Sequence, residues 1–134
     1  MAKFLLDTNI ISYWMRGDPK IIDKLKKHIP SELSFSTITF AEILYGIRKS
    51  NIKKKERLNK INSICDQLDI FAFDKSAAGK YGTIRANLER KGIPISERDL
   101  QIASIALAND LSVVTHNIKE FDRVPDLVCE DWAR

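Results

Sequence analysis

The sequence predicts an α/β protein, with a central, mainly parallel β-sheet flanked by helices in three layers. Short apolar runs alternate with longer segments of helical periodicity, which is the pattern of repeated βαβ units. The predicted strand at residues 113–115 begins with two adjacent valines, so apolar side chains point to both faces, as expected of a strand covered on both sides. With 134 residues, 44% of them hydrophobic, we expect a single domain over residues 1–134.

The first half of the chain contains two predicted strands and four predicted helices. The strands are apolar or alternating runs at residues 3–6 and 33–36. The helices are periodic segments at residues 8–16, 21–28, 38–49 and 58–68. Gly17, Asp18 and Pro19 separate the first helix from the second, because glycine and proline interrupt helices.

The second half repeats the alternation. Strands are predicted at residues 70–73, 113–115 and, as an edge strand, 127–129. Helices are predicted at residues 77–88 and 100–108. Gly92 follows the first of these as a stop signal, and the second is apolar on nearly all sides, so we expect it to be buried.

Composition excludes several classes of protein. The longest apolar stretches, such as residues 102–107, fall far short of the roughly 20 residues that a membrane span needs. Cys65 and Cys129 belong to no Cys-x-x-Cys or Cys/His cluster, which is typical of free thiols in a reducing compartment. The sequence therefore predicts a cytoplasmic protein that is not associated with a membrane.

Positive charge is concentrated in one segment. Residues 48–60 contain seven basic side chains and one acidic one, in a chain of net charge +4. Such a stripe is the footprint of a protein that binds a polyanion, although a solvated helix face is an alternative. Candidate nucleic-acid contacts in it are Arg48, Lys49, Lys53, Lys54 and Lys55.

Four acidic residues follow predicted strands or lie near the starts of predicted helices: Asp7, Glu42, Asp99 and Glu120. In open parallel sheets, ligands bind beyond the carboxyl ends of the strands. Carboxylates gathered there repel one another unless a cation neutralises them, and hard oxygen ligands suit Mg²⁺ or Mn²⁺. A phosphodiester could be hydrolysed at such a metal site.

Each acid also has a structural alternative. Asp7 could be the N-cap of the next helix. Residues 39–42 and 96–99 fit the capping-box pattern and its Asp variant, which would explain Glu42 and Asp99, and Glu120 could be a surface loop residue. Rival catalytic devices are missing: the chain has no phosphate-binding glycine loop, no Gly-x-Ser-x-Gly elbow, and only His28 and His116 as histidines.

Four blocks of the sequence, in order, resemble the VapC ribonuclease toxins of the PIN-domain family. They are Phe-Leu-Leu-Asp-Thr-Asn-Ile-Ile at 4–11, Ser-Thr-Ile-Thr-Phe-Ala-Glu-Ile-Leu-Tyr-Gly at 36–46, Asp-Leu-Gln-Ile-Ala at 99–103, and Val-Thr-His-Asn-Ile-Lys-Glu-Phe at 114–121 with Asp-Trp at 131–132. The resemblance covers essentially the whole chain. It implies a PIN-like fold and a Mg²⁺- or Mn²⁺-dependent endoribonuclease activity.

The resemblance also implies roles for individual residues. Asp7 and Asp99 would be the main metal ligands, completed by Glu42 and Glu120. The polar residues that would support them are Thr8, Asn9, Thr115 and Asn117. Trp132 is expected to anchor the C-terminal tail.

The partners implied by the resemblance are an RNA substrate, such as a tRNA, and a cognate VapB-like antitoxin that inhibits the toxin. A homodimer, within a larger toxin–antitoxin assembly, is also implied. Two alternatives stay open: a PIN-fold module that binds nucleic acid or a partner without turnover, and an RNA-processing or DNA-directed nuclease outside a toxin–antitoxin system.

The chain departs from the family pattern at two places. Glu97 and Arg98 stand before Asp99, where Gly, Pro or Asn is common; Glu97 could add charge near the metal, and Arg98 could pair with Glu97 or touch RNA. Asp126 stands where Gly is common, which leaves the geometry of that loop open. The role of His116 is also open.

Overall fold

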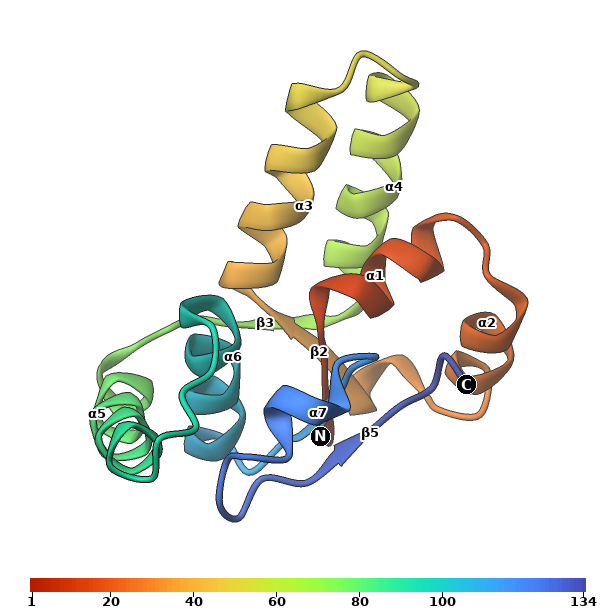
Figure 1. Cartoon of the computed structure of the whole chain (residues 1–134). Coiled ribbons are helices and arrows are strands. Elements are labelled where there is room, and N and C mark those ends of the chain that lie inside the picture. The colour runs from red at the N-terminus through yellow and green to blue at the C-terminus, as the bar shows by residue number, and fades with distance from the viewer.

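A five-stranded parallel sheet forms the centre of the computed structural model, which describes residues 1–134 (Figure 1). The strands are short and pair in the order β3-β2-β1-β4-β5. In chain order their bounds are β1 Phe4–Leu6, β2 Leu33–Ser36, β3 Asp69–Phe71, β4 Ser112–Val114 and β5 Cys129–Glu130. Because every pairing is parallel, all five carboxyl ends lie at one edge of the sheet. The predicted fold class is confirmed.

Seven α-helices connect and cover the strands. They are α1 Thr8–Met15, α2 Pro19–Leu25, α3 Thr37–Lys49, α4 Lys54–Gln67, α5 Lys75–Arg90, α6 Glu97–Ala108 and α7 Ile118–Phe121. A short 3₁₀ turn, Pro30–Glu32, precedes β2. None of these helices has the length and apolar composition that a membrane span requires.

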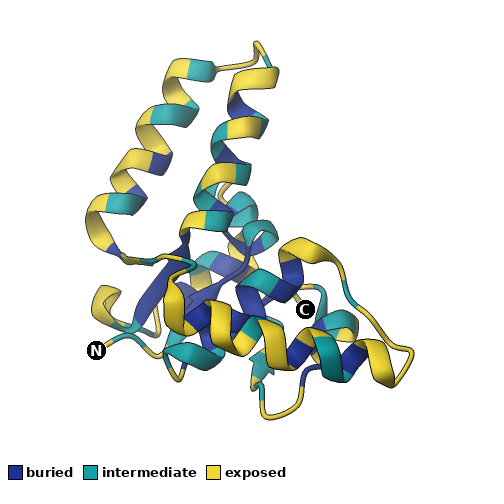
Figure 2. Cartoon of the chain, turned by 90° about the vertical axis from the view of Figure 1, so that its left-hand side faces the viewer, coloured by how far each residue is buried: buried dark blue, intermediate teal, exposed yellow.

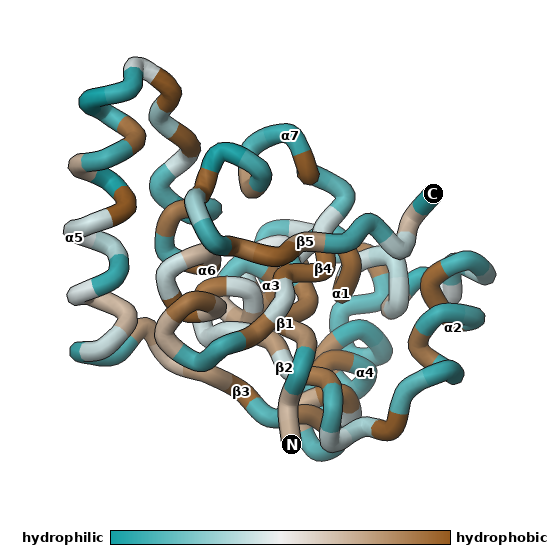
Figure 3. The backbone as a smooth tube through the Cα atoms, turned by 90° about the horizontal axis from the view of Figure 1, so that it is seen from below, coloured by the Kyte–Doolittle hydropathy of each residue, from teal (hydrophilic) through white to brown (hydrophobic).

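Two hydrophobic cores form, one on each face of the sheet. Adjacent strand residues point to opposite faces. Leu6 and Val114 accordingly join the core made with α1 to α4, whereas Leu5 and Val113 join the core made with α5 to α7. The buried residues follow the strands and the inner faces of the helices (Figure 2), and the apolar strands run through the middle of the fold (Figure 3). The sheet is therefore the middle of three layers.

The helices α3 and α4 form an antiparallel hairpin that rises away from the sheet (Figure 1). Its inner face is apolar, because Ile61 and Ile64 are buried in the same core as Ile43 and Ile47. The basic segment forms the far tip of this hairpin. Only the base of α3, near Ser36, lies at the edge of the sheet.

The C-terminal tail is fixed by aromatic packing, as predicted for Trp132. The indole is 3% exposed and stacks on the His28 ring at 5.0 Å between centroids. Phe4 contacts both rings edge-on. Just before the tail, Asp126 has φ +67°, a left-handed backbone that glycine adopts without strain and that aspartate tolerates better than most residues. The loop thus keeps a backbone suited to Gly although Asp stands there.

Most element boundaries differ from prediction by one to four residues, and three differences between the structure and the prediction have a clear physical cause. The edge strand is displaced to Cys129–Glu130, because the Thr115 amide donates to the Glu130 carbonyl at 2.9 Å. The helix expected at 100–108 begins at Glu97, where Ser96 caps it. The turn of helix α7 was not predicted, because four residues are too few to show periodicity.

Candidate functional site

The candidate site lies where β1, β2 and β4 end. These three strands are neighbours, with β1 in the middle, so the residues that follow them meet although they are distant in sequence. Asp7 follows β1 directly, and Thr115 follows β4. The structure brings all four predicted acids to this edge, where hydrogen bonds between the segments that follow the strands hold them.

Asp7 is fully buried and both its oxygens are engaged. One accepts the Thr8 amide hydrogen at 2.8 Å and caps α1, and the other accepts the Thr115 hydroxyl at 2.8 Å. Burial raises the pKa of Asp7, although these hydrogen bonds oppose the shift. The N-cap alternative is therefore correct, but it does not compete with a role at the site, because the same carboxyl group faces the other acids.

Asp99 is also fully buried, in the first turn of α6. Its amide donates to the Ser96 hydroxyl at 3.2 Å, whereas the Ser96 amide donates to Glu120 at 2.7 Å and not to Asp99. The proposed capping box is thus only half present, and the Asp99 carboxyl is left for the site. Burial, together with the neighbouring carboxylates of Glu120 and Asp7, raises the pKa of Asp99 to about 7.

Glu42 does not cap its helix, so the capping-box interpretation of residues 39–42 is wrong. Ser36 is the N-cap of α3 and accepts the Thr39 amide at 3.1 Å. Glu42 lies further along the helix and points across the edge of the sheet. It accepts the Thr8 hydroxyl at 2.7 Å and the Arg98 guanidinium at 2.9 Å.

Glu120 is held by α7, and it is not a free surface residue. Its Oε1 accepts the Ser96 amide and its Oε2 accepts the Asn117 side-chain amide at 2.7 Å. Asn117 Nδ2 also donates to Asp99 at 2.9 Å, and the Asn117 backbone amide donates to the Thr115 hydroxyl at 2.9 Å. Hydrogen bonding with Asp99 lowers the pKa of Glu120, which is the opposite direction to the shift of Asp99.

The predicted supporting residues therefore divide. Thr8, Thr115 and Asn117 each bond to an acid of the site, whereas Asn9 does not: its side chain accepts the His116 amide at 3.3 Å. His116 itself lies 3.1 Å from Asp131 and is half exposed. Asn9 and His116 thus fasten α1 and the C-terminal tail to the loop after β4, and neither forms a hydrogen bond with an acid of the site.

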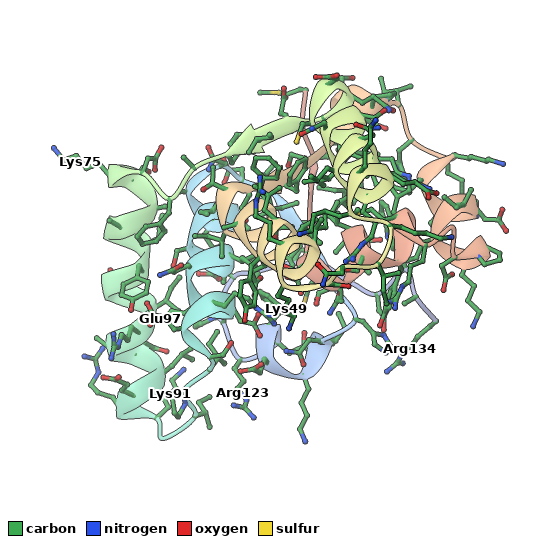
Figure 4. All side chains as sticks on the ribbon, turned by 90° about the horizontal axis from the view of Figure 1, so that it is seen from above. Lys49, Lys75, Lys91, Glu97, Arg123 and Arg134 are labelled. Atoms are coloured by element: carbon green, nitrogen blue, oxygen red, sulfur yellow. The ribbon has the colours of Figure 1, made fainter.

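Glu97 points away from the site, which excludes the suggestion that it adds charge there. Both its oxygens accept the Tyr81 hydroxyl, at 2.7 and 2.8 Å, and Arg85 approaches it at 3.9 Å. Glu97 is accordingly directed to α5 (Figure 4). Arg98 pairs with Glu42 and Asp99 instead of Glu97. The sequence showed that Arg98 adjoins Asp99, but its contact with Glu42 crosses between helices and carries no local signal.

The basic residues are apart from the acids. Arg48 and Lys49 end α3, and Lys53 to Lys55 lead into α4 at the tip of the hairpin. Lys49 lies 5.1 Å from the centre of the Tyr45 ring, and Tyr45 is exposed. Tyr45 therefore lies on α3 between Glu42 and the basic tip, against one of the lysines of the tip.

The donor set suits a divalent cation, although no three side chains enclose a ready-made cation site. The four carboxyl groups supply hard oxygens. Burial and the neighbouring carboxyl groups of Glu120 and Asp7 raise the pKa of Asp99, whereas Arg98 opposes this shift. Arg98 and Asn117 bridge these groups in place of a cation. By contrast, a cavity of about 210 Å³ between Trp14, Leu25 and Leu68 has no acidic lining residue, so it offers no comparable chemistry.

A parallel sheet with four acidic residues at its carboxyl edge fits the class of α/β proteins that bind a ligand or a cation at that edge. Similarity to known proteins identifies the family within this class. Residues 4–127 match the PIN domain family, and the chain belongs to that family. It is 38% identical to Ribonuclease VapC2 of Rickettsia felis, over 98% of both chains. It is 36% identical to the tRNA(fMet)-specific endonuclease VapC of Salmonella typhimurium, over 99% of this chain and 100% of the relative. The crystal structure of DNA-bound VapBC from Salmonella typhimurium contains a chain with TM-score 0.90 and 35% identity, covering 98% of this chain and 99% of that one.

Proposed function

We propose that this chain, as a single PIN domain over residues 1–134, is a divalent-metal-dependent endoribonuclease. We propose further that it is the toxin of a type II toxin–antitoxin module. The observation that carries the proposal is the burial of Asp7 and Asp99 at one edge of the sheet, in a chain whose relatives are named VapC ribonucleases.

The residues have distinct roles in this proposal. Asp7 and Asp99 hold Mg²⁺ or Mn²⁺, with Glu42 and Glu120 completing the acidic set. When bound, the ion supplies an activated water and charge neutralisation at the phosphodiester. Thr115 and Thr8 hold the Asp7 carboxyl in one orientation, and Thr8 also holds Glu42. Asn117 keeps Asp99 and Glu120 together. Glu42 lies at the half-exposed rim, where it can accept a proton from the attacking water.

RNA reaches the site along α3 in this proposal. The basic tip binds phosphates without reading sequence, and Tyr45 offers an exposed ring for base stacking between the tip and Glu42. Because the Salmonella relative is named for tRNA(fMet), initiator tRNA is the first defined substrate to test.

The proposal includes a partner and an assembly. Structural relatives are solved as VapBC complexes, some with DNA. We infer that a VapB-like antitoxin inhibits this chain, that the toxin forms a homodimer within a larger complex, and that it acts in the cytoplasm.

Cleavage of RNA by the purified, antitoxin-free chain tests the proposal. Total bacterial RNA and initiator tRNA are incubated with Mg²⁺ or Mn²⁺, with EDTA, and with the Asp7→Asn variant. Discrete cuts that disappear in EDTA and in the variant support it. Equal cleavage by the variant would identify a contaminating nuclease.

A binding module without turnover is the second candidate, because Arg98 already neutralises part of the acidic site. Binding of RNA with no cleavage in either metal, at several pH values, would favour it. A nuclease outside a toxin–antitoxin system would instead cleave RNA but have no antitoxin encoded beside it.

A further inference from the structure

Arg98 crosses the mouth of the acidic site. It is in the first turn of α6, immediately before Asp99. Its Nη1 lies 2.9 Å from Glu42 Oε2 on α3, and its Nε lies 3.4 Å from Asp99 Oδ1. The guanidinium thus joins two helices at the point where their acids meet.

These contacts are the only ion pairs that Glu42 and Asp99 make. Asp7 contributes a further negative charge that acts on Arg98 at longer range. Arg98 is therefore the principal counterion of the site. A divalent cation held by these acids would need the same oxygens, and its charge would repel a guanidinium at that distance.

We propose that Arg98 is a built-in competitor of the divalent cation. Arg98 stabilises the metal-free chain by pairing with Glu42 and Asp99, and it thereby lowers the affinity of the site for metal. This inference rests on the metal site of the proposed function. The Arg98 side chain is 43% exposed, so it has solvent into which it can turn when the cation takes its place.

Competition predicts two effects of opposite sign when Arg98 is removed. Arg98→Gln binds Mn²⁺ more tightly, because the carboxylate oxygens of Glu42 and Asp99 no longer have to separate from a guanidinium before they bind the ion. The metal-free form of this variant melts at a lower temperature, because the two acids have lost their counterion. A residue that only supported the helices would lower the melting temperature without raising metal affinity.

Calorimetric titration of Mn²⁺ into metal-free protein, with melting curves in EDTA and in Mn²⁺, tests this inference. We expect Arg98→Gln to bind Mn²⁺ at least about tenfold more tightly than the wild type. Its melting temperature should rise more on adding Mn²⁺. Arg98→Lys, which keeps the charge but not the planar fork, should show a smaller gain, and it replaces Arg98→Gln if that variant does not fold.

Arg85→Gln is the matched control, since it removes one positive charge from an arginine that pairs with Glu89 on α5, away from the acids. It should leave Mn²⁺ affinity unchanged. Unchanged or weaker binding by the Arg98 variants, or an equal gain in Arg85→Gln, overturns the inference while the metal site stands. If the wild type binds no Mn²⁺ and behaves like Asp99→Asn, the proposed metal site itself fails, and the inference fails with it.

Discussion

The acidic edge of the sheet and the basic tip of the α3–α4 hairpin carry opposite charges and are built in opposite ways. Each acid of the edge is held by hydrogen bonds from other segments, and Asp7 and Asp99 are fully buried. The tip is a continuous stretch of sequence, and most of its lysines are exposed. Hydrolysis at one bond requires groups fixed in position, whereas attraction of a phosphate chain requires only charge. A single change at the edge should therefore cost far more activity than several changes at the tip.

Removing one charge from the edge should abolish most activity. Asp99→Asn is expected to lower RNA cleavage by at least about 100-fold. The variant loses one of the two buried carboxylates proposed to hold the metal ion that neutralises charge in the transition state. The metal-free variant should be no less stable than the wild type, since the unfavourable buried charge disappears. Cleavage rates and melting curves measure both effects.

Asp110→Asn is the matched control, because Asp110 lies in the turn after α6 at the opposite end of that helix and has φ +54°, which asparagine tolerates. It should cleave RNA at the wild-type rate. A similar loss in both variants would show that the decrease does not come from the site.

Removing three charges from the tip should weaken binding but spare the reaction. A triple variant in which Gln replaces Lys49, Lys54 and Lys55 should raise KM about tenfold and leave kcat within about twofold of the wild type. In a plot of the logarithm of the RNA-binding constant against the logarithm of salt concentration, the slope should become shallower by roughly one unit for each phosphate that the tip no longer binds. The same change at Lys24, Lys26 and Lys27 of the α2 region is the control. Equal effects of both triple variants would mean that net charge alone matters, and not the hairpin.

Thr115 tests whether the edge depends on its hydrogen bonds. Thr115→Val keeps the shape but removes the donor to Asp7 and the acceptor of the Asn117 amide. We expect the free energy of unfolding to fall by about 1–3 kcal/mol, because buried polar groups lose their hydrogen-bond partners. The rate of RNA cleavage should fall as well. Thr115→Ser, which keeps the hydroxyl, should restore most of both. Full activity in the valine variant would contradict the role given to Thr115.

The smallest effect concerns pH. The pKa of Asp99 is raised to about 7 in the folded chain, above its ordinary value of 3.8. A raised carboxyl pKa contributes stability below the unfolded pKa and loses it as pH rises through the folded pKa. The melting temperature of the metal-free protein should therefore fall between about pH 5 and about pH 7.5. Saturating Mn²⁺ and Asp99→Asn should each flatten this dependence, and a rise over that range would contradict the assignment.

Sequence patterns predicted the sheet well because strand ends and helix starts have local signals. Asp7 follows a three-residue apolar run, and the rule for parallel sheets places it at the edge with Asp99. Local patterns failed where two segments compete for one group. The pattern Thr39-x-x-Glu42 suggested a capping box, but Ser36 takes the cap because β2 ends there, and Thr8 and Arg98 take Glu42.

The remaining contacts could not be predicted because they depend on how helices pack. Glu97 and Arg98 are adjacent in sequence, yet one contacts α5 and the other contacts α3. Successive residues of a helix point about 100° apart, so the partner of each is decided by its neighbours in space. That the four acids share one edge of the sheet could be predicted from sequence, but not the bonds that hold them there.

The bond between Thr115 and Asp7 joins residues 108 positions apart, and this has a consequence for the synthesis of the protein. Ribosomes make the chain from its N-terminus, so Asp7 and Glu42 emerge long before Thr115, Asn117 and Glu120. A partly made or prematurely terminated chain lacks the groups that hold Asp7 and Asp99 in place. The complete acidic site can therefore form only after synthesis has passed Glu120, more than a hundred residues after Asp7.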